Sequence, residues 1–338
     1  MLSNRFLNAS VLNGKSVKEH YEFLQPLIGA FNALKPQLAT HEINSHMLAL
    51  MGPNQRQEQV AAVLGLADDW QKSEAIEGLA AGLAHLSESQ REDLVTAALG
   101  LAYDSEKAQA LAGLGPGLAH LSESQREDLV TAALNLDNDW YRAQALAGLG
   151  TVLAHLSESQ REDLVTAALG LTDEGHKAEA LAGLGAGLAA LDGTQQQALV
   201  TAALRLAEDE YKAEAIAGLG AGLAALERSQ QQALVTAALN LDNDWYRAQA
   251  IAGLGPGLAA LEGAQQQALV TAALDLDNGR GKAQAIAGLG AGLAALKGSQ
   301  QQALVKAALG LVDNEDKAEA LAGLANGYQA SRVRDYLR

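Results

Sequence analysis

The chain repeats itself every 35 residues. The segment HLSESQREDLVTAAL occurs unchanged three times, beginning at His85, His120 and His155. A basic residue returns at the same interval, without insertion or deletion, at Lys72, Lys107, Arg142, Lys177, Lys212, Arg247, Lys282 and Lys317. Such self-similarity is typical of repeat architectures, and it predicts eight tandem units over residues 52–331.

Each unit is predicted to contain two short helices. The first helix begins at a capping-box pattern such as Ser89 with Glu92, which recurs in seven of the eight units and fails only at Ala264. The second begins at a polar residue of the N-cap type, such as Asp104. Apolar residues then recur three or four apart, and no segment alternates with the period of a strand. The sequence therefore predicts an all-α chain.

A pair of short helices cannot bury its apolar face alone, whereas stacked pairs share one core. We therefore predict a right-handed α-solenoid in which residues 52–331 form eight two-helix repeats. Residues 1–51 are predicted to be a flexible segment, over 1–16, followed by a helical cap over 17–50. Residues 332–338 are predicted to be a C-terminal tail or cap that extends the last helix.

The run AIAGLGAGLAAL at 215–226 places Gly218, Gly220 and Gly222 in a pattern similar to a nucleotide-binding loop. A dinucleotide fingerprint follows a strand and occurs once per binding unit, whereas this run follows a helix start and recurs along the array. We predict instead that the small residues let neighbouring helices pack closely. Pro116 and Pro256 enter the same run in two units, where they are predicted to bend or end the helix.

Composition excludes several functions. The chain has 24 Lys and Arg against 40 Asp and Glu, a formal net charge of −16, and no cysteine. Nucleic acid and anionic membranes are unfavourable partners for this charge, and thiolate metal sites are excluded. Because nearly every residue is copied from unit to unit, no unique catalytic, cofactor or metal-binding set stands out. We predict no enzymatic activity, cofactor, metal or small-molecule ligand, and we interpret the three repeated histidines as surface residues.

The segments WYRAQAIAGLGPGL at 245–258 and WYRAQALAGLGTVL at 140–153 resemble HEAT-like bacterial repeats that read roughly Y-x-R-A-x-A-L-A-x-L-A-P-x-L. The resemblance covers most of each unit but departs from that pattern by placing glycine where alanine is usual. It implies a bacterial interaction scaffold and offers no catalytic residues to transfer. The first eighteen residues contain no acid, which is compatible with an export signal. The predicted location is therefore the bacterial cytoplasm or, for a secreted effector, a host cell.

The repeat layout also resembles that of transcription-activator-like effectors, which join two helices by a short variable loop. Their basic, glycine-rich loop that faces DNA is missing here, since the corresponding loops read DNDW, AYDSE and AEDEY. A nucleic-acid-binding repeat array therefore remains only as the alternative function.

Two sets of residues are candidates for function. Aromatic residues gather before or at the start of the second helix: Trp70, Tyr103, Trp140, Tyr141, Tyr211, Trp245 and Tyr246. They either bind a protein partner, through this loop ridge or the concave face, or pack within and between units. The eight recurring basic residues are interpreted as an internal ladder that pairs with acids or helix-end carbonyls. Their alternative role is to present cations to an acidic partner.

Overall fold

The structure is a computed structural model that describes residues 48–49, 51–80 and 82–336. Within these residues it contains 16 α-helices and no strand, and consecutive helices lie in contact. The predicted all-α solenoid of two-helix repeats is therefore confirmed. The flexible segment predicted over 1–16 lies outside the described residues, as does the cap over 17–50 apart from a short stretch at its end.

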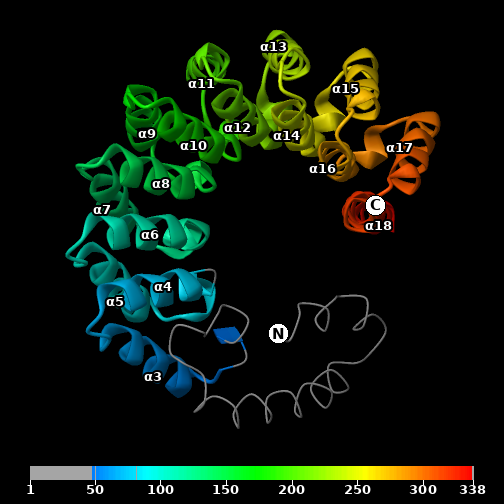
Figure 1. The fold of residues 1–338 in the computed structure, drawn as a ribbon. Coiled ribbons are helices and arrows are strands. Elements are labelled where there is room, and N and C mark those ends of the chain that lie inside the picture. Colours follow the sequence, from blue (N-terminus) through cyan, green and yellow to red (C-terminus); the bar gives the residue numbers. More distant parts are fainter. Residues whose placement is uncertain (1–47, 50, 81, 337–338) are drawn as a thin grey trace, which may run out of the picture.

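The helices form two rows that follow a curved arc (Figure 1). The first helix of each repeat lies on the outer side: α3 (Pro53–Leu64), α5 (Glu88–Leu99), α7 (Glu123–Leu134), α9 (Glu158–Gly170), α11 (Gly193–Arg205), α13 (Arg228–Leu239), α15 (Gly263–Asp275) and α17 (Gly298–Gly310). The second helix lies on the inner side: α4 (Asp69–Ala80), α6 (Asp104–Leu114), α8 (Asp139–Gly150), α10 (Glu174–Gly185), α12 (Asp209–Leu219), α14 (Asp244–Leu254), α16 (Gly279–Gly290) and α18 (Asn314–Tyr336). The apolar core runs continuously between the two rows.

Short 3₁₀ helices lead from each inner helix to the next outer helix: η5 (Leu83–His85), η6 (Gly115–His120), η7 (Leu153–His155), η8 (Leu188–Ala190), η9 (Gly220–Ala225), η10 (Gly255–Ala260) and η11 (Leu293–Ala295). The two prolines stand in the first turn of η6 and η10, and α6 and α14 end at Leu114 and Leu254. The predicted early helix ends are therefore confirmed. Without a proline, α12 ends at the equivalent Leu219, so the glycine-rich sequence also permits this transition.

The outer helices begin two residues earlier than predicted. Ser87, rather than Ser89, caps α5: its hydroxyl accepts the backbone N–H of Gln90, and the Gln90 side chain accepts the backbone N–H of Ser87 (2.8 Å). Both serines fit the capping-box pattern, but the structure uses the glutamine that recurs in all eight units. These glutamines are Gln55, Gln90, Gln125, Gln160, Gln195, Gln230, Gln265 and Gln300.

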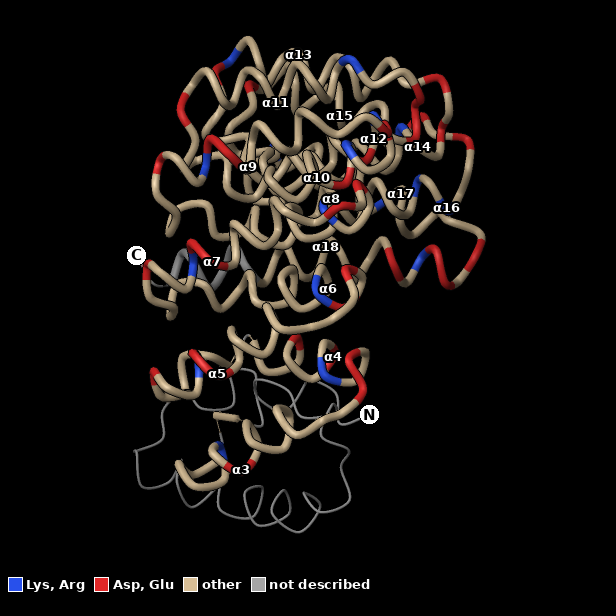
Figure 2. The backbone as a smooth tube through the Cα atoms, turned by 90° about the vertical axis from the view of Figure 1, so that its left-hand side faces the viewer, with Lys and Arg blue, Asp and Glu red and all other residues tan. Residues whose placement is uncertain are grey.

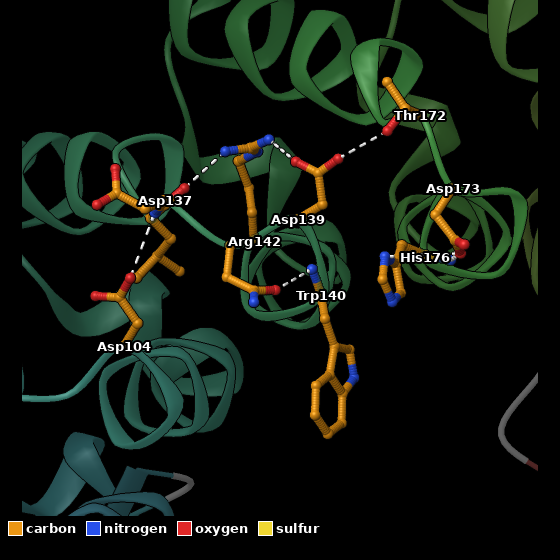
Figure 3. Close-up of polar contacts among 10 residues, drawn as sticks. Asp104, Asp137, Asp139, Trp140, Arg142, Thr172, Asp173 and His176 are labelled. Carbon is orange, nitrogen blue, oxygen red and sulfur yellow. Dashed lines mark hydrogen bonds and ion pairs between the residues drawn. The ribbon is translucent and has the colours of Figure 1, made fainter.

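The predicted caps of the inner helices are also displaced, by one residue. Asp139 is the first helical residue of α8, and the cap is Asn138, whose side-chain oxygen accepts the backbone N–H of Trp140 (2.8 Å). The Asp139 carboxylate bonds outside the cap. Asp139 Oδ2 accepts a hydrogen bond from Thr172 Oγ1 of the next repeat (3.2 Å; Figure 3).

Close packing of the inner helices is confirmed at the glycines. A Cβ atom on Gly218 would lie 2.2 Å from the Cα of Ala182 in the preceding repeat. A Cβ on Gly220 would lie 2.1 Å from the carbonyl oxygen of Gly253 in the following repeat. Neither distance leaves room for a side chain, so glycine is required on both sides of the helix. Because the inner row packs more closely than the outer row, the array curves toward its inner side (Figure 1).

The last helix, α18, continues through residue 336. Residues 332–336 of the predicted C-terminal tail belong to this helix. The helix is the longest of the described inner helices, and it closes the C-terminal end of the array (Figure 1).

Candidate interaction surface

The concave surface is formed by one face of each inner helix. In α8 this face carries Trp140, Gln144 and Ala147, which are spaced four and three residues apart and therefore lie on the same side. The opposite side carries the fully buried Leu146 and Leu149, which pack toward the outer row. Trp140 points away from its own and neighbouring helices (Figure 3). The second, sixth and ninth residues of each inner helix therefore line the concave surface.

The three tryptophans share one position, the second residue of an inner helix. The exposed fraction is 56% for Trp70, 54% for Trp140 and 36% for Trp245. Trp245 is the most covered because the guanidinium of Arg280, one repeat later, lies 5.4 Å from the ring centroid. Large exposed aromatic side chains are typical anchors of protein interfaces. These tryptophans thus lie at the edge of the concave surface and are accessible to a partner.

The tyrosines have other surroundings. Tyr141, Tyr211 and Tyr246 occupy the third helical position, where they are half-buried against the core. Tyr246 donates a hydrogen bond through its hydroxyl to Glu210 of the preceding repeat (3.1 Å), and the pKa of Tyr246 is raised chiefly by this bond. Tyr141 stacks on Trp140 with ring centroids 5.3 Å apart. The Tyr246 side chain therefore joins two repeats, whereas Tyr141 packs within its own repeat and against the core.

Tyr103 stands apart from the other aromatic residues. It is the cap residue of α6, and its side chain makes no capping hydrogen bond. At 67% it is the most exposed of the aromatic residues proposed for the ridge. The predicted aromatic ridge therefore divides into exposed residues, which are Tyr103 and the tryptophans, and half-buried tyrosines.

The eight basic residues are all half-buried and occupy the fourth position of the inner helices. Arg142 pairs with Asp139 and donates to the carbonyl of Leu136 (2.6 Å), and Arg247 pairs with Asp244 and the carbonyl of Leu241 (2.8 Å). Both patterns match the contacts predicted for an internal ladder. Within the described chain, no lysine of the series forms such a bond.

Lys177 instead lines an open groove of about 870 Å³ between α9 and α11, beside Glu174 and Arg205. Lys282 lines a comparable groove of about 830 Å³ near α17. The role of the lysines therefore stays a prediction, whereas the two arginines have structural partners.

Glutamate dominates the charge of the concave surface. Among the second, sixth and ninth positions of the inner helices, the charged residues are Glu74, Glu77, Glu179, Glu210, Glu214, Glu315 and Glu319, with Arg280 as the one base. This row was missed from the sequence. The signal was present, because Glu or Gln recurs every 35 residues at the sixth position of the inner helix.

The glutamates in the middle of the array repel one another. Burial, followed by the charges of Glu179 and Glu210, raises the pKa of Glu214 above its ordinary value. Burial also raises the pKa of Glu179, while nearby His176 opposes the shift. In the described residues none of these three glutamates forms an ion pair with Lys or Arg. The concave surface therefore has an uncompensated acidic centre between Trp140 and Trp245.

The repeated histidines do not lie on this surface. His85, His120 and His155 end the 3₁₀ helices η5, η6 and η7, where they are exposed. In the part of the chain that the structure describes, no three His, Asp or Glu side chains gather in a way that would hold a metal ion. No described helix is both long and apolar enough to cross a membrane.

The fold and this surface together define an α-solenoid repeat protein with an acidic, tryptophan-bearing concave face. Comparison with protein-family models and with curated proteins found no match for the chain.

Proposed function

We propose that the chain is a non-enzymatic scaffold that binds a protein partner through the concave face. The single observation that carries this proposal is the row of exposed tryptophans at equivalent positions of three inner helices, Trp70, Trp140 and Trp245. An aromatic side chain left in water costs free energy that burial against a partner would recover. The glycine-packed inner row supplies a firm support for these side chains.

Charge favours a protein over a nucleic acid as the partner. Phosphate backbones are bound by exposed Lys and Arg, which release condensed counterions. The concave face instead carries glutamates, and Arg280 is its one cation among the lining positions of the inner helices. The basic residues that recur every 35 positions are half-buried on a different side of these helices. These observations oppose the alternative of a nucleic-acid-binding array.

The HEAT-like resemblance supports the same proposal, because such arrays act as interaction scaffolds. It extends the proposal to a bacterial protein, either cytoplasmic or secreted as an effector. The proposed scaffold needs no cofactor or small-molecule ligand. Its surface offers repeated contacts along an arc, as expected for binding an extended partner.

A pull-down comparing three forms of the intact chain tests this function. The site variant combines Trp70→Ser, Trp140→Ser and Trp245→Ser, since Ser105 already occupies the equivalent position in α6. The control combines Glu92→Gln, Glu127→Gln and Glu162→Gln on the outer row, where other repeats have Gln197, Gln232 and Gln267. Circular dichroism checks that both variants remain folded.

We expect the intact chain and the control to retain the same proteins from an extract of the source organism, and the tryptophan variant to lose them. Retention by all three forms, or by none, would contradict binding through the concave face. Tyr141 and Tyr246 are left unchanged, because both pack against the core and Tyr246 also hydrogen-bonds to the preceding repeat.

A further inference from the structure

The contact between Arg280 and Trp245 shows which group this surface can accept. The guanidinium carbon of Arg280 lies 5.4 Å from the centroid of the Trp245 ring, within the range of a cation–π interaction. The equivalent residue one repeat after Trp140 is Gly175, and the one after Trp70 is Ser105. Neither can cover the preceding ring. Two of the three tryptophans therefore lack the cation that the third receives from its own chain.

Acidic side chains occupy the two inner helices that follow Trp140 along the array. Glu179 is one helical turn after Gly175, and Glu210 and Glu214 occupy the next inner helix. Glu210 accepts the hydroxyl of Tyr246, which fixes one carboxylate oxygen and leaves the negative charge uncompensated. Burial, followed by repulsion from Glu179 and Glu210, raises the pKa of Glu214, so an added cation nearby would relieve an existing unfavourable interaction. The face thus combines aromatic platforms with unpaired carboxylates.

We propose, building on the function proposed above, that the partner contributes an extended, arginine-rich segment to the concave face. Its guanidinium groups stack on Trp140 and Trp70 as Arg280 stacks on Trp245, and its remaining charge pairs with Glu179, Glu210 and Glu214. Arginine fits better than lysine because its planar group stacks on a ring while donating to carboxylates. A second copy of this chain is a poor occupant, since each copy has a net charge of −16.

The dimensions define a suitable probe. Trp70 in α4 and Glu214 in α12 are four repeats apart, which at about 8–10 Å between packed helices is roughly 32–40 Å. An extended peptide of about eleven residues spans a similar length at roughly 3.3–3.6 Å per residue. The probe is therefore a fluorescently labelled oligo-arginine peptide of about this length. Oligo-lysine and oligo-glutamate peptides of equal length serve as comparisons.

Fluorescence anisotropy at physiological salt measures the affinity of the full chain for each peptide. We expect oligo-arginine to bind more tightly than oligo-lysine by about threefold or more, since cation–π and bidentate contacts favour the guanidinium. Oligo-glutamate should not bind. Equal affinity for the two cationic peptides, or no binding of oligo-arginine, would overturn the arginine assignment.

Two variants locate the binding. Trp140→Ser should weaken oligo-arginine binding by roughly two- to fivefold, the size of an exposed cation–π contact. The combination of Glu179→Gln, Glu210→Gln and Glu214→Gln should weaken it by about tenfold, because several close charge pairs are removed together. The outer-row control with Glu92→Gln, Glu127→Gln and Glu162→Gln removes equal charge and should change the affinity by less than about twofold. An equal loss in the control would mean diffuse attraction and contradict the proposed site.

The pull-down separates this inference from the proposed function. If a partner is lost with the tryptophan variant while oligo-arginine does not bind, the scaffold function stands and the arginine-rich partner is rejected. If neither the partner nor the peptide depends on the concave residues, both proposals are rejected. Competition by oligo-arginine for the captured partner would support both.

Discussion

The carboxylate of Asp209 accepts a hydrogen bond from the backbone N–H of Asp242, which lies in the loop of the following repeat, over 2.8 Å. The same connection recurs between Asp69 and Ala102 (2.9 Å) and between Glu174 and Ala207 (2.9 Å). One acid at the start of an inner helix therefore fixes the loop of the next repeat. Figure 2 shows acidic and basic residues near the inner helices α4 and α6 as well as on the outer helices α5 and α7.

Replacing Asp209 with alanine should weaken the junction between two repeats. The substitution removes an acceptor for the N–H groups of Asp242 and Asn243 and a favourable negative charge at a helix start. We expect a loss of about 1.5–3 kcal/mol in unfolding free energy, as for hydrogen bonds to charged groups. Urea denaturation measures it, and hydrogen exchange should show faster exchange at Asp242.

Asp242→Ala is the matched control, because it removes one carboxylate from the same loop while keeping the Asp209 acceptor. Its effect should stay within about 0.5 kcal/mol, as for most surface substitutions. Equal destabilisation by the two variants would mean that loop charge, rather than the hydrogen bond between repeats, determines stability.

Gly218→Ala should disturb the inner row although it adds only a methyl group. The new Cβ would lie 2.2 Å from the Cα of Ala182, so α10 and α12 must separate. We expect a loss of about 1–3 kcal/mol from overpacking, reduced by the better helix propensity of alanine. Thermal unfolding followed by circular dichroism measures the loss. Small-angle scattering should show a larger radius of gyration as the arc opens.

Gly193→Ala is the control for this substitution. Gly193 begins the outer helix α11, and a Cβ there meets no atom within 4 Å. This variant should be neutral or slightly more stable, because alanine restricts the unfolded chain. If Gly218→Ala matched it, close approach of the inner helices would not explain the repeated glycines.

Gln196→Ala should leave the carbonyl of Leu191 without its hydrogen-bond donor, whereas the carbonyl of Leu188 keeps the backbone N–H of Leu191 (3.1 Å). The buried Gln196 side chain donates through Nε2 to Leu188 O (2.9 Å) and Leu191 O (3.0 Å), at the 3₁₀ helix that precedes α11. Its removal is expected to cost about 1–3 kcal/mol, measured by urea denaturation.

Gln196→Arg distinguishes the hydrogen bonds from shape alone. Arg161 stands at the equivalent position of the preceding repeat and donates to the carbonyl of Leu156 (2.6 Å). The arginine variant should therefore retain stability within about 1 kcal/mol of the original chain, less than the loss of a buried hydrogen-bonding partner. Comparable damage from arginine and alanine would contradict a hydrogen-bonding role for this position.

The repeat and its helices were predictable because many residues contribute to the periodic pattern. An exception at a single position does not remove that pattern. The helix caps were harder to predict, because Ser87 and Ser89 both begin a segment that matches the capping-box pattern. The choice between them depends on where the preceding 3₁₀ helix ends. The role of Asp209 was unpredictable for a similar reason: its acceptor bonds to a loop 33 residues away, which a local capping rule does not include.

The candidate site was predicted in part. The aromatic residues were identified from the sequence. Which of them are exposed and which are half-buried depends on how each inner helix is oriented in the array, because adjacent residues such as Trp140 and Tyr141 face different neighbours. The sequence did reveal that Glu or Gln recurs at one helical position. Only the stacking of α10 on α12 brings Glu179 close enough to Glu214 for their charges to interact, whereas Glu210 and Glu214 are neighbours in one helix.

Glu214→Gln should stabilise the chain at neutral pH. The pKa of Glu214 is raised by burial and by Glu179 and Glu210, so the folded chain holds its proton to a higher pH than the unfolded chain does. Ionisation of Glu214 therefore lowers the unfolding free energy as pH rises from the ordinary glutamate pKa through the raised value. Glutamine avoids this loss, and Gln144 and Gln249 show that the position accepts it.

We expect the melting temperature of Glu214→Gln at pH 7 to exceed that of the original chain by up to about 2 °C, since the group is partly exposed and solvent screens the repulsion. The difference should shrink toward zero below about pH 4, where both folded and unfolded chains carry a protonated Glu214. Glu92→Gln on the exposed outer row should change stability by less than about 0.5 kcal/mol at pH 7. A lower melting temperature for Glu214→Gln at pH 7 would show that the Glu214 carboxylate is compensated within the array. In that case the acidic centre would have no unsatisfied charge to offer a cationic partner.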